Sequence, residues 1–255
     1  MSLKEYRKAS CLTQWFPLIR DAGVPVPKTE IVETDLELIH ICDGMEAFLK
    51  RIDQGAYTAF LSSLRNACRS VSEDGPWFLR TGHFSGKHNW ENTCYVTDLD
   101  RLERHVSYLV NDSMLVDFLG LPTNFWVVRA FLPTKPLGWL TAYGGMPLCR
   151  EFRCFVSNGE VVCIHPYWPR KAIIEGFEYP CPGEDTISDL YFRSSSLGPD
   201  ERGRILKLAL QVATVVPGDW SVDILDTKDG WYVTDMAVAH ESFHWEGCEK
   251  AEPNS

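Results

Sequence analysis

The loop at residues 81–88 carries residue types that bind phosphate. It reads TGHFSGKH and places Ser85, Gly86 and Lys87 between two predicted strands. Glycine leaves backbone amides uncovered and lysine supplies an ammonium, and both groups contact phosphate oxygens in proteins. The GxxxxGK[ST] and GxGxxG spacings are absent, so neither a P-loop nor a Rossmann turn is indicated. An ordinary glycine turn with a solvated lysine is the alternative interpretation.

Two aspartates, Asp223 and Asp235, lie on the two arms of a predicted late hairpin. If residues 228–230 form a three-residue loop, Thr227 pairs with Trp231 and the two aspartates fall directly opposite each other. Carboxylates about 5 Å apart on one face repel each other unless a cation lies between them. Mg²⁺ fits that place because it prefers carboxylate and phosphate oxygens. A one-residue change of register would instead make them unrelated surface acids on opposite faces.

Arg153 lies among apolar residues of an earlier hairpin, and Glu151 is two positions before it on the same face. One interpretation is a structural Arg–Glu pair. The other is a fixed guanidinium that faces an anionic ligand, because the planar fork of arginine donors matches phosphate oxygens.

Two hairpins and a helix position these residues. Asn158-Gly159 between alternating segments predicts a hairpin over residues 151–164, since this dipeptide favours a tight two-strand turn. The second hairpin covers residues 220–236, and apolar residues at helical spacing predict a helix over 199–215 between the two.

The part of the chain before the glycine loop is mixed α and β. Helices are predicted at 3–22, 45–52 and 56–71, and a strand is entered over 24–32. A turn cluster at 73–76 then divides a small leading lobe, 1–72, from the remainder, 73–255. In that remainder the pattern predicts strands at 77–81 and 126–132 and a helix capped by Asp98.

Composition limits the classes of function. The chain has 255 residues and a net charge of −10, which argues against broad phosphate neutralisation of a nucleic acid. Its nine cysteines form no CxxC pair and no zinc-finger spacing with histidine, so reduced, buried thiols are expected and no structural zinc site is indicated. A charged N-terminus and the lack of a long apolar run predict a cytoplasmic protein that does not enter membranes.

The order of the segments resembles the ATP-grasp fold. A strand with a cation, a glycine loop with lysine, a strand ended by proline, a hairpin opening with Glu-Phe-Arg and a late hairpin with acids on both strands follow in that order. The matching segments are 78–81, 128–133, 151–156 and 222–224. They are similar to a divergent clade of small ATP-grasp proteins of bacteria and phages, and more distantly to the eukaryotic cell-division-cycle ATP-grasp proteins that assist translation-factor assembly. The likeness covers residues 76–245 and, more loosely, 15–27.

This resemblance implies an α/β (α+β) architecture in which two sheet-bearing lobes grip ATP, behind a small N-terminal lobe. It implies that Arg80 and Lys87 contact ATP phosphates, with Ser85 and Gly86 in the same loop. Lys87 would also be catalytic, because its charge would stabilise the moving γ-phosphoryl group.

The resemblance also implies roles for the hinge and the first hairpin. Ala130, Phe131 and Leu132 would contact adenine through backbone groups, although Ala130 stands where an acid is common. Glu151 would face the ribose. Arg153 would be catalytic, at the terminal phosphate or the substrate.

For the metal, the resemblance implies that Asp223 and Asp235 bind Mg²⁺. The usual closing motif is Glu-x-Asn, whereas this chain has Asp235-Met236-Ala237. A third metal ligand is therefore missing unless His240, Glu241 or a water molecule replaces it.

The activity that the resemblance implies is an ATP- and Mg²⁺-dependent ligase. It would convert a carboxylate of a small molecule or peptide to an acylphosphate, which an amine or thiol then attacks. The alternatives are a nucleotide-binding assembly factor without turnover, which would act on a protein partner, and a small-molecule kinase.

Overall fold

The computed structural model describes residues 10–116, 121–246 and 248. The chain forms two compact units. Unit 1 comprises Met1–Val26, Leu132–Ala142 and Pro147–Ser255, and unit 2 comprises Pro27–Phe131 and Tyr143–Met146. The lobe boundary expected between residues 72 and 73 stays a prediction, and it is a boundary of a different kind, since both residues belong to unit 2.

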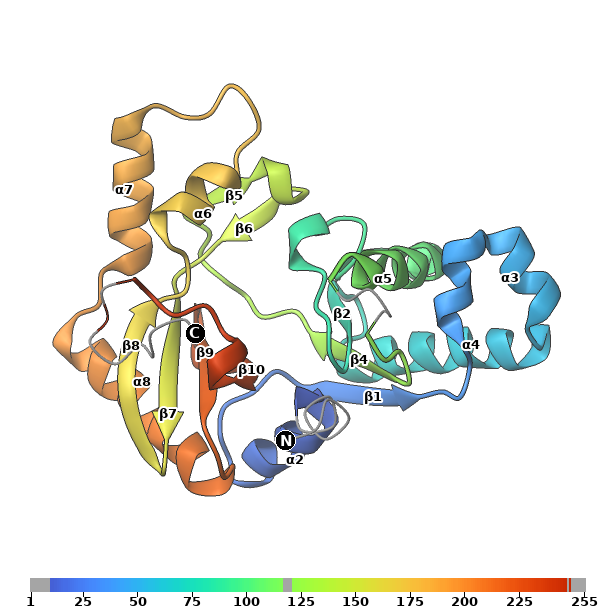
Figure 1. Ribbon diagram of the computed structural model, residues 1–255, viewed down its shortest axis with the longest axis horizontal. Helices are drawn as coiled ribbons and strands as arrows, with labels where there is room; N and C mark the ends of the chain where they lie inside the picture. The colour runs from blue at the N-terminus through green and yellow to red at the C-terminus, as the bar shows by residue number, and fades with distance from the viewer. Residues whose placement is uncertain (1–9, 117–120, 247, 249–255) are drawn as a thin grey trace. The chain divides into compact units, whose positions relative to one another are not determined.

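Unit 2 is built on a four-stranded antiparallel sheet with the order β1-β4-β2-β3 (Figure 1). The strands are β1 Thr29–Glu33, β2 Trp77–Thr81, β3 Tyr95–Val96 and β4 Phe125–Ala130. The strands predicted at 77–81 and 126–132 are therefore present, the second ending two residues earlier than expected. Each alternates between a face toward the helices and a face away from them.

Three helices accompany this sheet: α3 Met45–Arg51, α4 Gln54–Val71 and α5 Leu102–Val116. Helix α4 starts two residues before the predicted Ala56, because Asp53 caps it by accepting hydrogen bonds from two backbone amides of its first turn. Apolar side chains of α4 and α5 form one core with Trp77, Leu79 and Trp126 of the sheet. The face of the sheet that carries these three residues is thus filled by helices.

Unit 1 is built on a second four-stranded antiparallel sheet, with the order β10-β9-β7-β8. Its strands are β7 Glu151–Ser157, β8 Glu160–Pro166, β9 Trp220–Thr227 and β10 Gly230–Val238. The hairpin predicted at Asn158-Gly159 is confirmed: Asn158 has φ of 52° and Gly159 of 81°. Two consecutive positive φ values are what a type I′ turn requires, and Asn-Gly adopts them readily.

Helix α8, Pro199–Val215, forms as predicted and contacts β7 and β8. It packs on the face of the sheet that carries apolar residues such as Phe152 and Val222, both almost completely buried. The opposite face carries Arg153, His165, Asp223 and Asp235, and we call it the polar face. The functional residues of this unit therefore lie away from α8.

The remaining elements of unit 1 surround this sheet. They are α2 Leu12–Asp21, α6 Arg170–Glu175 and α7 Glu184–Ser195, together with a ribbon of β5 Gly138–Leu140 and β6 Met146–Leu148. The predicted N-terminal helix is confirmed from Leu12 onward, and its expected start at residue 3 lies outside the described residues. Helix α2 contacts α8, and Gln211 Nε2 donates a hydrogen bond to Ala22 O.

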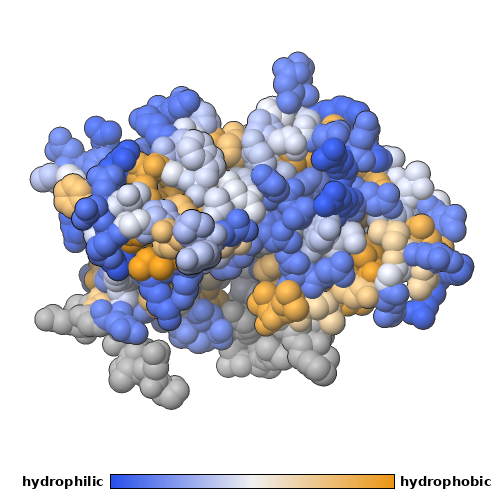
Figure 2. Space-filling view, turned by 90° about the horizontal axis from the view of Figure 1, so that it is seen from above, coloured by the Kyte–Doolittle hydropathy of each residue, from blue (hydrophilic) through white to orange (hydrophobic). Residues whose placement is uncertain are grey.

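The surface in the view of Figure 2 is mostly hydrophilic, and its apolar residues form separate patches. In the part of the chain that the structure describes, every helix is too short or too polar to cross a membrane.

Candidate functional site

The pairing of β9 with β10 puts Asp223 directly opposite Asp235. The sequence predicted this pair, but from a turn that is wrong. Thr227 pairs with Gly230 rather than Trp231, so the loop has two residues instead of three. That register alone would place Asp223 opposite Thr234. A β-bulge at Thr234, between Val233 and Asp235, shifts the ladder by one residue and restores the aspartate pair.

The bulge is held by a contact to another strand. Thr234 Oγ1 donates a hydrogen bond to Glu151 Oε1 at 3.0 Å and another to Asp223 O at 3.3 Å. Glu151 is buried, with 6% of its surface exposed, at the start of β7. The carboxylate assigned to the ribose is therefore fixed in place by the residue that sets the β9–β10 register.

A row of ionisable residues crosses all four strands of this sheet. His165 pairs with Arg153, Arg153 with Asp223, and Asp223 with Asp235. Directly paired residues project to the same face, so the four side chains lie side by side on the polar face. The sequence placed Arg153, Asp223 and Asp235 in a site, and the structure brings all three together.

Arg153 binds Asp223 with two hydrogen bonds. Its Nε and Nη2 atoms donate to the two carboxylate oxygens at 2.8 and 2.9 Å, and the two side chains are 16% and 6% exposed. Burial lowers the pKa of Arg153, but the charge and hydrogen bonds of Asp223 outweigh burial and raise this pKa overall. The guanidinium also lies 4.8 Å from the centre of the Tyr167 ring. Arg153 is therefore a fixed cation, and its carboxylate partner is Asp223 rather than the expected Glu151.

The donor chemistry of the polar face fits Mg²⁺. Asp223, Asp235 and Glu151 supply carboxylate oxygens, which this hard cation prefers. The two hydrogen bonds from Arg153 use about half of the roughly four lone-pair positions of the Asp223 carboxylate, which leaves acceptor capacity for a metal ion. Asp235 Oδ1 accepts a hydrogen bond from the amide of Met236 at 3.0 Å.

The position of the missing third metal ligand is defined by the register. Ala237 pairs with Ser221, whose hydroxyl lies 2.6 Å from that of Ser242. His240 and Glu241, the replacements considered from the sequence, lie in the short 3-10 turn after β10 and are 3.5 Å apart. Ser221 is a further oxygen donor that the sequence did not single out.

In unit 2, Arg80 lies on the face of the sheet away from α4 and α5. Arg80 pairs with Val127, and Phe78 pairs with Arg129, so both arginines project to this same face. They are 5% and 3% exposed. Arg129 was not proposed as a site residue, although an arginine inside the otherwise apolar strand Phe125–Ala130 is the same signal that singled out Arg80.

The glycine loop is rigidly built. Thr81 Oγ1 accepts hydrogen bonds from the amides of His83 and Phe84, so these amides are engaged within the loop. Gly86 has φ of 63°, and a Cβ atom there would lie 2.8 Å from a methyl group of Leu109. Only glycine fits this position. Phosphate contacts would therefore come from the part of the loop after Phe84.

That part of the loop leads into a short 3-10 helix, Lys87–Asn89. Thr93 Oγ1 donates a hydrogen bond to Gly86 O at 2.6 Å, which ties the loop to the segment before β3. Lys87 is half-buried and Ser85 is partly buried, so both retain contact with solvent. The loop is thus a fixed platform that carries an accessible ammonium group.

The predicted hinge coincides with a junction of the two units. The chain passes from unit 2 to unit 1 between Phe131 and Leu132. The amide of Ala130 donates a hydrogen bond to Lys28 O at 2.8 Å. The Phe131 ring lies 5.2 Å from that of Tyr95, in an edge-to-face arrangement.

These features agree with a comparison at the level of sequence families. A family described as an ATP-grasp domain, the third family of its clade, matches residues 68–245. The chain belongs to this family. No curated protein shows significant sequence similarity to the chain.

Solved structures share the ATP-grasp fold at low sequence identity. C-terminally truncated Cdc123 from Schizosaccharomyces pombe is 11% identical with a TM-score of 0.56, over 93% of this chain and 86% of that one. A second structure of Cdc123 from the same organism is 14% identical with a TM-score of 0.52, over the same shares of each chain, 93% and 86%. N5-carboxyaminoimidazole synthase from Aspergillus clavatus, solved with ADP, is 10% identical with a TM-score of 0.50, over 91% of this chain and 44% of that one.

The comparisons confirm the predicted family and the distant likeness to the cell-division-cycle proteins. They also confirm the mixed α/β ATP-grasp architecture. The residues expected to bind nucleotide fall into two sets in this ATP-grasp protein. Arg80, Ser85, Gly86 and Lys87 belong to unit 2, and the row on β7, β9 and β10 belongs to unit 1. The role of each residue stays a prediction.

Proposed function

We propose that this protein is an ATP- and Mg²⁺-dependent ligase that activates a carboxylate as an acylphosphate. In the first step a carboxylate oxygen of the substrate attacks the γ-phosphorus of ATP, and the bond from that phosphorus to the β–γ bridging oxygen breaks. ADP leaves with the bond electrons. In the second step an amine or thiol attacks the acyl carbon, loses its proton, and releases inorganic phosphate. The substrate is a small molecule or a peptide that carries a carboxylate.

The observation that carries this proposal is the row of Arg153, Asp223 and Asp235 on the polar face of the unit 1 sheet. Phosphoryl transfer needs fixed charges around the moving group, because little covalent chemistry is left to the protein. Arg153 supplies a cation that Asp223 holds in one orientation. Preorientation of this kind lowers the cost of reorganisation during the reaction.

Mg²⁺ would be held by Asp223 and Asp235. When bound, it would neutralise phosphate charge as the γ-phosphoryl group moves. Glu151 would face the ribose, and its contact with Thr234 would keep it there while the metal site forms.

The residues of unit 2 have the complementary part. Arg80 and Lys87 would contact phosphate oxygens, with Ser85 and Gly86 presenting backbone and hydroxyl groups beside them. Charge-assisted hydrogen bonds of this kind are about twice as strong as neutral ones. The backbone of Ala130, Phe131 and Leu132 would contact adenine. Arg129 joins the phosphate set, because it shares the Arg80 face.

A second candidate is a nucleotide-binding assembly factor without turnover, which would act on a protein partner. Two observations favour it: Ala237 stands where the third metal ligand is usual, and both oxygens of Asp223 are engaged by Arg153. A small-molecule kinase is a third candidate. A cytoplasmic location stays a prediction for all three.

One assay separates these candidates. The protein is incubated with ATP, Mg²⁺, pooled amino acids and other carboxylates, and an amine or thiol acceptor, and ADP and phosphate are measured. Substrate-dependent release of both ADP and inorganic phosphate supports the ligase. Release of ADP with phosphate retained on a product supports the kinase. Tight ATP binding without any product supports the assembly factor and contradicts the ligase.

A further inference from the structure

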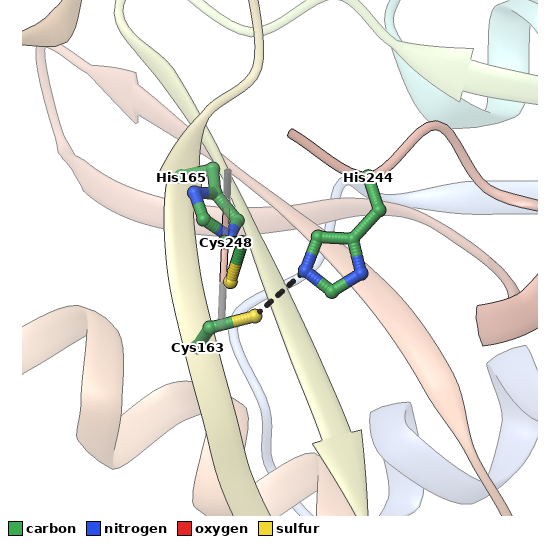
Figure 3. Close-up of side chains that lie close together, drawn as sticks. All are labelled: Cys163, His165, His244 and Cys248. Carbon is green, nitrogen blue, oxygen red and sulfur yellow. Dashed lines mark hydrogen bonds between the residues drawn. The ribbon is translucent and has the colours of Figure 1, made fainter. Parts of the chain in front are cut away.

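Four side chains with metal-binding atoms lie together in unit 1, outside the row proposed for the nucleotide. They are Cys163, His165, His244 and Cys248, and their ligand atoms all lie within 4.8 Å of one another (Figure 3). Cys163 and His165 are two positions apart on β8, so both project to the polar face of the sheet. His244 and Cys248 belong to the segment that follows the 3-10 turn after β10.

The segment is held against the sheet by contacts on both sides of His244. Trp245 Nε1 donates a hydrogen bond to Pro166 O at 2.9 Å. The His244 ring stacks on Phe155, with ring centres 4.0 Å apart and an angle of 8° between the planes. The Trp245 ring stacks on His165 with centres 6.1 Å apart. These contacts explain why His244 lies beside Cys163 and His165, although about 80 residues separate them in sequence.

The spacing of the donor atoms is close to that of a tetrahedral zinc site. With Zn–N and Zn–S bonds of ordinary length, the ligand atoms of such a site lie ~3.3–3.8 Å apart. Cys163 Sγ lies 3.2 Å from His244 Nε2, a contact drawn in Figure 3. The widest separation, at most 4.8 Å, needs a contraction of about 1 Å, which a side-chain rotation supplies.

The state of the imidazoles also suits a metal. His165 Nε2 is buried and finds no hydrogen-bond partner among the described residues. Burial lowers the pKa of His165 and of His244, which keeps both rings neutral near pH 7, the form that binds metals. Burial, with Cys248 nearby, raises the pKa of Cys163 to about 12, so a metal ion would have to displace the thiol proton.

We propose that Cys163, His165, His244 and Cys248 bind one Zn²⁺ ion as a structural site. Two thiolates and two imidazoles in a tetrahedral set are typical of zinc and unsuited to Mg²⁺, which prefers oxygen. Four protein ligands leave no position for a substrate, so the ion stabilises structure rather than catalysing a reaction. Binding releases one proton from each of the two thiols.

The site connects the C-terminal segment to the phosphate-handling row. His165 is the direct neighbour of Arg153 across β8 and β7. Arg153 Nη1 also contacts Phe243 O at 3.5 Å, one residue before His244. Zinc would therefore hold residues 243–246 and 248 on the sheet and support Arg153 from the side opposite Asp223.

The first test is the zinc content of the full chain. The protein is purified without a histidine tag or chelator, under reducing conditions, and its zinc is measured by inductively coupled plasma mass spectrometry. One zinc ion per chain is expected in the wild type. Cys163→Ser and His244→Gln should lose it. The matched controls Cys181→Ser and His40→Gln alter an exposed cysteine and a histidine of unit 2, and both should retain it.

A second test uses the wild type alone, so that it does not depend on how the variants fold. Metal-free protein is titrated with Co²⁺ in the absence of nucleotide. The expected result is a thiolate-to-cobalt charge-transfer band and intense visible d–d bands, which Zn²⁺ abolishes by displacement. Chelation should lower the melting temperature, and added Zn²⁺ should restore it.

Three results would overturn the proposal. One is a wild-type protein that contains no zinc and takes up neither Zn²⁺ nor Co²⁺. Another is zinc content that survives in both site variants. The third is a disulfide between Cys163 and Cys248 in protein kept under reducing conditions. Because none of these readouts involves nucleotide, failure of the ligase proposal and failure of this one are distinguishable.

Discussion

Arg153 donates two hydrogen bonds, from Nε and Nη2, to the two carboxylate oxygens of Asp223. A guanidinium therefore already compensates this carboxylate, whereas the sequence suggested a magnesium ion for that part. Asp235, its neighbour across β9 and β10, has a more exposed position. The two aspartates are consequently expected to respond differently to substitution.

Asp223→Asn should destabilise the protein in the absence of metal and nucleotide. The change leaves the buried Arg153 cation facing a neutral amide, and loss of one partner of a buried pair costs about 3 kcal/mol. Urea unfolding of wild type and variant measures the difference. Asp219→Asn, at an exposed aspartate just before β9, is the control and should unfold as the wild type does. Equal stability of Asp223→Asn and wild type would show that the ion pair contributes nothing.

Asp235→Asn should leave the metal-free protein within about 1 kcal/mol of wild type, because its removal relieves repulsion from Asp223 and asparagine keeps the oxygen that accepts from Met236 N. It should remove most of the Mg²⁺-dependent part of ATP binding. Melting curves with ATP alone and with ATP plus Mg²⁺ measure that part. If the magnesium-dependent increment survives in both aspartate variants, the metal ion lies elsewhere.

Lys87→Ala and Arg80→Ala should each weaken ATP binding by about tenfold or more, since a hydrogen bond to a charged group contributes about 1.5–3 kcal/mol. Lys87→Ala should fold normally, because the side chain remains in contact with solvent. Arg80 is buried, so its variant needs a parallel unfolding measurement. Lys171→Ala, at an exposed lysine of α6, is the control for isothermal titration. Wild-type affinity in both folded variants would remove these residues from the phosphate site.

Glu201→Gln should lower stability in a pH-dependent way. Hydrogen bonds from Arg150 are the main reason that the pKa of Glu201 is lowered to about 2, below the value of about 4.3 in an unfolded chain. This depressed pKa stabilises the fold above about pH 4.3, and the contribution is lost as the pH falls toward 2.

The variant should therefore be less stable than wild type at pH 7, by about 1 kcal/mol because Glu201 is partly exposed and solvent screens its charge. The gap should narrow between pH 4.3 and 2. Urea unfolding over this range tests the sign, and Glu160→Gln at the exposed start of β8 should show no such trend. A gap that widens on acidification would contradict the assigned pKa direction.

Local patterns predicted those features that depend on neighbouring residues. The Asn158-Gly159 hairpin and α8 follow from turn chemistry and helical spacing, and both were predicted. The Asp223–Asp235 pair was reached through a wrong turn. Its actual cause is a bulge at Thr234 that depends on Glu151, 83 residues away, and no local pattern encodes that contact.

The partner of Arg153 was missed for a similar reason. Glu151 is two residues away in sequence, whereas Asp223 becomes its neighbour only when β7 pairs with β9. The cysteine and histidine cluster likewise has no recognisable spacing, because β8 supplies Cys163 and His165 and a segment about 80 residues later supplies His244. Sequence reasoning therefore located the polar residues of the site but not the contacts that fix them.

Binding of Mg²⁺–ATP to the wild-type chain tests the central claim most directly. A ligand that binds only the folded state stabilises it by about 2.7 kcal/mol at one hundred times its dissociation constant. We predict a rise in melting temperature with millimolar Mg²⁺–ATP and with a non-hydrolysable analogue, larger than the rise with ATP alone. An unchanged melting temperature under all these conditions would contradict the account.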